Sequence, residues 1–237
     1  MPPWPKWPRR SASRPARAPS AARSSGWTCR EKKSTHAAER DRPDVVAKRA
    51  AWFARFAGRR VVDLVFLDEF GANTKMQRTH GRAAPGERVV AKVPHGHYKA
   101  ISTIAALSVK GIVASASFDG GTTAARFVDF VRDELCPALR KGQVVVLDNL
   151  AAHNDRRVDA LIESAGCVVL RLPPYSPDFN PIENAISKVK AMLRKLAERT
   201  VPRLLKGIAE ALRSVTAADA KAYIAHCGYA TKRCKPL

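Results

Sequence analysis

The sequence predicts an α/β fold in which helices flank a mixed five-stranded sheet. After residue 59, three strand-like runs precede any helical pattern, which favours an antiparallel start to the sheet. Helical and strand-like segments then alternate, which favours parallel additions. Two runs, VVDLVFL and VVVL, are almost continuously apolar and β-branched. Such runs are typical of strands that are buried on both faces of a sheet.

Individual elements follow from the spacing of apolar residues. Five runs have strand character, at 61–67, 99–108, 112–118, 144–147 and 167–172. Lys110-Gly111 is expected to join the second and third runs as a hairpin. Helical spacing is found at 122–139, 156–165 and 181–199, and again between Leu204 and Val215. This order is typical of the ribonuclease H-like fold, in which the first and fourth strands are neighbours.

The chain divides by composition into three regions. Residues 1–40 are rich in Pro, Ser, Ala and Arg without apolar periodicity, which predicts a flexible, disordered basic arm. Residues 41–58 are expected to form a linker helix, with Val45, Trp52 and Phe56 on its apolar face. Residues 59–237 then form the predicted catalytic domain.

Charge points to the partner of this protein. The 42 Lys and Arg residues exceed the 21 acidic residues and give a formal net charge of +21. Such an excess favours nucleic acid, because bound phosphates release counterions, although a merely basic protein would share it. The five cysteines show no CxxC pair, and no run is apolar enough to span a membrane. We therefore expect a cytoplasmic protein that acts on the chromosome, at the nucleoid if the host is bacterial, and not at a membrane.

Three carboxylates stand where elements begin or end. Asp68 follows the first predicted strand, Asp148 follows the fourth, and Glu183 lies at the start of the long helix. Divalent magnesium prefers such hard oxygen ligands. Any one of these residues alone could be a turn or helix cap. Four prolines between Pro173 and Pro181 make a stiff segment that would fix where Glu183 enters its helix.

Four segments resemble bacterial insertion-sequence transposases of the Tc/mariner superfamily. They are FLDEFG, KVPHGHYK, VVVLDNLAAH and LPPYSPDFNPIEN, and 34 residues separate Asp148 from Glu183, as in Asp-Asp-Glu members of that superfamily. The resemblance implies that Asp68, Asp148 and Glu183 bind two Mg²⁺ ions, for which Mn²⁺ can substitute. It also implies cleavage at transposon ends, strand transfer into target DNA, and a homodimer on double-stranded DNA. The helix-turn-helix pattern usual in such proteins is not found in the first 40 residues.

Two other functions remain open at this point. The chain could be a ribonuclease H-like nuclease without strand transfer, or a catalytically silent DNA-binding repressor remnant. Among the remaining polar residues, Glu69 is expected to point away from Asp68, while Asn149 and His153 could orient a ligand or contact phosphate. A basic series after the first strand is expected to contact DNA beside the metals. It comprises Lys75, Arg78, Arg82, Arg88 and Lys92.

Overall fold

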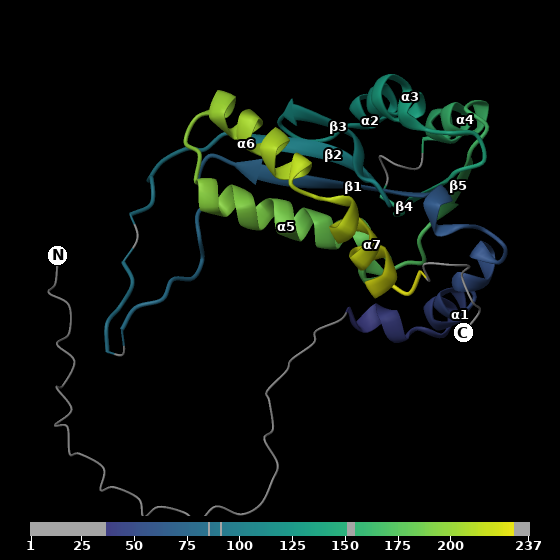
Figure 1. Ribbon diagram of the computed structural model, residues 1–237, viewed down its shortest axis with the longest axis horizontal. Coiled ribbons are helices and arrows are strands. Elements are labelled where there is room, and N and C mark those ends of the chain that lie inside the picture. Colours follow the sequence, from purple (N-terminus) through teal and green to yellow (C-terminus); the bar gives the residue numbers. More distant parts are fainter. Residues whose placement is uncertain (1–36, 85, 91, 151–154, 230–237) are drawn as a thin grey trace, which may run out of the picture. The chain divides into compact units, whose positions relative to one another are not determined.

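The computed structural model describes residues 37–84, 86–90, 92–150 and 155–229 (Figure 1). These residues belong to one compact unit, His36–Leu237. The predicted basic arm lies outside the described residues except at its end, where a 3-10 turn forms at Ala38–Asp41. No helix among the described residues has the length and apolar character needed to cross a membrane.

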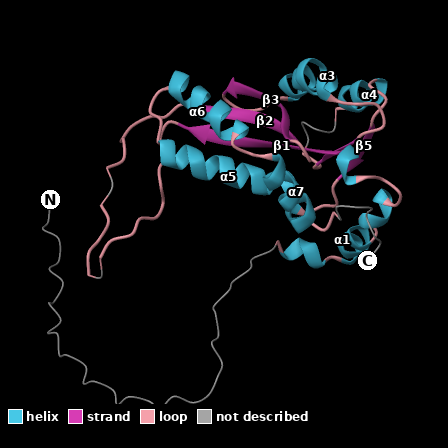
Figure 2. Ribbon diagram, viewed as in Figure 1, coloured by secondary structure: helices cyan, strands magenta, loops and turns pink. Residues whose placement is uncertain are grey.

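A mixed five-stranded sheet forms the centre of the fold, with strand order β3-β2-β1-β4-β5 (Figures 1 and 2). Strands β1 (Leu64–Asn73), β2 (Ala100–Ser108) and β3 (Gly111–Asp119) are antiparallel. Strands β4 (Val144–Leu147) and β5 (Val168–Arg171) add to the β1 edge in parallel. The predicted fold class and the predicted neighbours β1 and β4 are thus confirmed.

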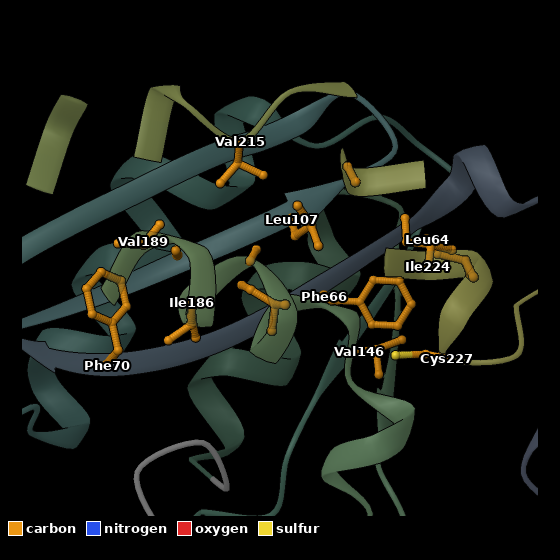
Figure 3. Close-up of a cluster of buried hydrophobic side chains, with 14 of the residues drawn as sticks. Leu64, Phe66, Phe70, Leu107, Val146, Ile186, Val189, Val215, Ile224 and Cys227 are labelled. Atoms are coloured by element: carbon orange, nitrogen blue, oxygen red, sulfur yellow. The ribbon is translucent and has the colours of Figure 1, made fainter. Parts of the chain in front are cut away.

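Helices cover both faces of the sheet. Successive apolar side chains of β1 point to opposite faces, so each face carries apolar residues that the helices bury. On one face, Val65 and Leu67 pack with apolar residues of α2 (Ala124–Phe130) and α4 (Arg156–Ser164). On the other, Phe66 and Phe70 belong to a buried cluster that also contains side chains of three helices. These helices are α5 (Pro181–Leu196), α6 (Val201–Arg213) and α7 (Ala217–His226). Two of them, α5 and α7, have residues labelled in Figure 3.

The first strand differs from its predicted position. Residues Val61–Asp63 form a 3-10 turn, and β1 starts at Leu64 and continues to Asn73. Asp68 therefore lies within the strand instead of after it. Beyond Phe66 the strand loses its β4 neighbour but remains paired with β2 as far as Asn73. The polar pair Asp68-Glu69 ends the apolar run in the sequence, and so the pattern did not predict this one-sided extension.

One predicted helix is divided in the structure, and one helix was not predicted. Residues 122–139 comprise α2, a π-helical turn at Val131–Leu135 and the short α3 (Cys136–Ala138), in which Pro137 has no backbone N–H to donate. The predicted helical region between Leu204 and Val215 corresponds to α6, and α7 follows it as an additional helix. A capping box between Thr216 and Asp219 starts α7, which the apolar pattern did not predict.

The predicted linker region packs into the same core as the sheet. Helix α1 (Pro43–Ala50) is followed by a 3-10 turn at Phe53–Phe56. Trp52, Phe53 and Phe56 are buried in the cluster that contains Phe66. Tyr229, near the end of the described chain, places its ring 5.0 Å from Phe66 and 5.4 Å from Phe56. The domain boundary at residue 59 stays a prediction.

Candidate active site

The three predicted carboxylates line one pocket. Asp68 lies in β1, Asp148 comes directly after β4, and Glu183 is the third residue of α5, which lies against β1. The parallel register that pairs Phe66 with Val146 brings Asp68 and Asp148 level as the two strands diverge. Asp68 is only 8% exposed, Asp148 is half-buried and Glu183 is exposed. Three segments distant in sequence thus supply acids to one place.

Burial and the neighbouring negative charges in this pocket change the pKa of Asp68. Burial, followed by the negative charge of Glu183, raises the pKa of Asp68 from 3.8 to about 8. The carboxylates of Asp148 and Glu69 act in the same direction, while a hydrogen bond from the Glu69 backbone N–H opposes them. Because like charges disfavour ionisation, the pocket favours either a proton or a cation beside Asp68.

The described residues do not form a preassembled metal cluster. No three His, Cys, Asp or Glu side chains in this part of the chain are gathered so that they could hold a metal ion. Carboxylate oxygens are nevertheless the donors that a hard divalent ion prefers. The oxygen donors that line the pocket therefore suit Mg²⁺ or Mn²⁺ in their chemistry.

Asn180 is a member of this site that the sequence reasoning missed. Its side-chain Nδ2 donates a hydrogen bond of 2.9 Å to Oδ2 of Asp68, while the backbone N–H of Glu69 donates to Oδ1 at 2.7 Å. The position of Asn180, three residues before Glu183 and directly before Pro181, was the available signal. An Asn in front of a helix commonly caps that helix, so its position in the sequence does not indicate a contact with β1.

The segment before α5 is held by residues from α1. Arg49, whose side chain is 12% exposed, donates to Oγ of Ser176 at 2.6 Å and forms an ion pair of 2.6 Å with Asp178. Its guanidinium also lies 4.2 Å from the ring centroid of Phe179. The predicted stiffness of this segment thus comes from its prolines together with a bidentate arginine contact.

Tyr229 provides a second attachment for the same segment. Nε1 of Trp52 donates to the Tyr229 hydroxyl at 2.9 Å, and that hydroxyl donates to the backbone oxygen of Phe179 at 2.9 Å. Phe179 directly precedes Asn180. The aromatic core around Tyr229 is therefore connected, through two hydrogen bonds and one peptide unit, to the residue that contacts Asp68.

Tyr229→Phe is expected to lower the free energy of unfolding by about 1–3 kcal/mol. The variant keeps the buried ring but removes the hydroxyl that bonds Trp52 and Phe179. Denaturant unfolding measures the difference. Tyr223→Phe, at a half-buried tyrosine on α7, is the matched control and is expected to change stability by less than about 0.5 kcal/mol. Equal stability of the Tyr229→Phe variant and the unaltered chain would contradict this account of the segment.

The other candidates have different surroundings. Asn149 lines the pocket and donates to the backbone oxygen of Leu172 at 2.6 Å, which ties the end of β4 to the end of β5. Glu69 is not among the residues lining this pocket, as strand alternation predicts. His153 lies outside the described residues.

The basic series occupies the connection between β1 and β2. None of its five members lines the carboxylate pocket, and Figure 1 shows this connection extending away from the sheet. The prediction that these residues lie beside the metals is therefore wrong, because β1 continues past Asp68 and moves the start of the connection outward. Lys75 is half-buried, and the other four members are exposed, which leaves their charges accessible; they are Arg78, Arg82, Arg88 and Lys92.

Comparisons with known proteins agree with this geometry. The structure resembles the Mos1 mariner paired-end complex with Mn, with a TM-score of 0.65, 17% identity, and coverage of 85% of this chain and 63% of that chain. It also resembles the Mos1 strand transfer complex (TM-score 0.62, 18% identity, 88% and 62% covered). The Mos1 mariner catalytic domain alone gives a TM-score of 0.56 at 17% identity, with 85% and 91% covered.

This chain thus spans somewhat less than two thirds of the longer Mos1 chains and nearly all of the catalytic domain. The likeness confirms the ribonuclease H-like fold. Among curated proteins, no sequence matches the chain. The family profile of DDE superfamily endonucleases matches residues 63–204, which is more than half of the sequence and includes all three carboxylates. The chain therefore belongs to the DDE superfamily of endonucleases.

Proposed function

We propose that this protein is the catalytic part of a cut-and-paste DNA transposase. The observation that carries the proposal is the shared pocket of Asp68, Asp148 and Glu183, in which the pKa of Asp68 is raised. The family membership and the Mos1 strand transfer complex among similar structures support the same reaction class. The substrates are double-stranded DNA at transposon ends and at the target, and the active form is a homodimer on DNA in the bacterial cytoplasm, at the nucleoid.

The three carboxylates are assigned as ligands of two Mg²⁺ ions, with Mn²⁺ able to substitute. Such ions would activate the attacking oxygen and neutralise charge on the leaving oxygen during phosphodiester cleavage. Asp68 and Asp148 approach from adjacent strands, and Glu183 approaches from the helix that lies over β1. Rigid elements therefore present the acids, which favours fixed positions for the reacting groups. Asn180 and the Glu69 backbone N–H hold the two oxygens of Asp68.

DNA binding is assigned in part to the basic connection between β1 and β2. Its exposed Lys and Arg side chains can neutralise phosphates, in keeping with the net charge of +21. The Nζ atom of Lys75 lies 5.3 Å from the ring centroid of Tyr98, so the two ends of the connection contact each other. Because this connection extends away from the pocket, it would bind DNA at a distance from the cleaved bond.

The proposal is tested with a duplex that carries the terminal inverted repeat flanking the coding sequence, together with a supercoiled plasmid as target. With Mg²⁺ or Mn²⁺ we expect nicking at the repeat and covalent joining of its 3′ end to the plasmid, and neither product in EDTA. Hydrolysis without joining would replace the proposal by a nuclease. DNA binding without nicking in either metal would replace it by a silent DNA-binding protein.

A further inference from the structure

Asn180 occupies the N-cap position of α5, but its side chain does not cap that helix. An Asn in this position normally accepts a hydrogen bond from the first turn of the helix. Here the side chain is 2% exposed, and its Nδ2 donates to Oδ2 of Asp68 across 112 residues of sequence. The usual local role of the residue is thus replaced by a contact with the carboxylate that is most deeply buried in the pocket.

The second polar atom of this side chain has no protein partner. Oδ1 of Asn180 is buried and has no hydrogen-bond partner among the described residues. A buried acceptor without a hydrogen-bond partner lowers the stability of the folded state by about 1–3 kcal/mol. The presence of one at this position therefore needs an explanation. When Asp68 is ionised, as it is beside a bound cation, exchanging the amide's N and O would place an oxygen against its carboxylate and remove the one favourable contact. The unpartnered atom is therefore the acceptor, and it belongs to a residue that lines the carboxylate pocket.

We propose that Asn180 is a positioning residue of the metal site, an inference that rests on the proposed function. Its amide N–H fixes the orientation of the Asp68 carboxylate. Its Oδ1 accepts a hydrogen bond from a water molecule of the hydration shell of the divalent cation held by the three acids. Magnesium keeps several waters when it binds proteins, and each such water needs an acceptor.

The chemistry of an amide explains why this position suits Asn. A Lys or Arg donor would neutralise Asp68 and repel the incoming cation. A second carboxylate could not donate to Asp68 when ionised. The amide supplies one neutral donor and one neutral acceptor on a short, stiff side chain. The segment that carries it is fixed by Arg49 and Tyr229, so the amide is held in place before a cation binds.

The test is Mn²⁺ binding by the full chain, followed through the paramagnetic resonance signal of free Mn²⁺. Asn180→Leu keeps the branched shape of the side chain and lacks both polar atoms. It is expected to weaken Mn²⁺ binding by about 10–100-fold, the usual effect of removing a partner of a metal ligand. Its thermal unfolding in EDTA is expected to stay close to that of the unaltered chain, whereas a purely structural residue would lower it. If Asn180→Leu does not fold, Asn180→Ala is measured under the same criterion.

Two further variants separate the possible failures. Asn184→Leu, one turn farther along α5, removes an amide whose Nδ2 contacts Sγ of Cys227, and it is expected to bind Mn²⁺ normally. Asp148→Asn is expected to weaken binding strongly. If Asp148→Asn weakens binding while Asn180→Leu does not, the inference about Asn180 is overturned and the metal site stands. If the unaltered chain binds no Mn²⁺, or Asp148→Asn binds it equally well, the metal site is overturned together with this inference.

Discussion

Asp148→Asn is expected to lower the rate of cation-dependent DNA nicking by about a thousandfold or more, with the protein still folded. The substitution keeps the size of the side chain and removes one negative charge from the pocket. A bound metal stabilises charge in the transition state by several kcal/mol. Losing that stabilisation lowers the rate by about a thousandfold. The rate is measured as single-turnover nicking of the end-bearing duplex at saturating Mg²⁺. Glu183→Gln is expected to act in the same direction.

Two controls make this result specific. Asp159→Asn changes an acid on α4 that contacts Arg171 at 2.9 Å and does not line the pocket, and it is expected to keep the rate within a few-fold. Asp148→Asn is also expected to unfold at the same or a higher temperature in EDTA, because it relieves repulsion on Asp68. Full nicking activity in the Asp148→Asn variant would refute the assignment of the site.

In the absence of divalent cations, the protein is expected to lose stability as the pH rises from about 4 to about 8. The folded state raises the pKa of Asp68 from 3.8 to about 8, through burial first and the charge of Glu183 second. The folded state therefore binds the proton more tightly than the unfolded chain does. This contribution is fully present below pH 3.8 and is lost as the pH passes through about 8. Linkage gives a loss of up to about 6 kcal/mol.

Unfolding temperatures measured in EDTA across this range isolate the effect when they are compared with Asp68→Asn. That variant keeps the shape of the side chain but cannot titrate, so its stability is expected to depend much less on pH. Added Mg²⁺ at pH 8 is expected to stabilise the unaltered chain, because a ligand that binds only the folded state favours it. Identical pH profiles for the two proteins would contradict the buried, repelled state of Asp68.

The sheet was predictable because strand-like apolar runs differ in periodicity from the helical segments, and because the order of strands and helices along the chain is typical of this fold. The runs 144–147 and 99–108 match β4 and β2 within a residue, since turns and charged residues end both patterns. The extension of β1 to Asn73 was not predictable from apolar runs, because it depends on pairing with β2 alone. The role of Trp52, Phe53 and Phe56 in the central core was missed for a similar reason. Their partners, Phe66 and Tyr229, are remote in sequence.

The sequence indicated the three acids of the candidate site but not the residues that hold them and the neighbouring segment in place. Asp68, Asp148 and Glu183 were predicted from expected element boundaries and from the family resemblance; they line one pocket, although Asp68 lies within β1 and not after it. Asn180 was hidden because its position has a common local explanation as a helix cap. Arg49 was hidden because its partners, Ser176 and Asp178, lie more than a hundred residues away and only the fold brings them together. Side chains that act through long-range contacts leave no periodic pattern.

The central claim is that two aspartates and a glutamate from three separate elements share one divalent cation site. Crystals grown with Mn²⁺ and measured at the manganese absorption edge test it most directly. We expect anomalous density between Asp68, Asp148 and Glu183, with carboxylate oxygens at about 2.0–2.2 Å from the ion. Anomalous density elsewhere, or an ion held without one of these three side chains, would contradict it.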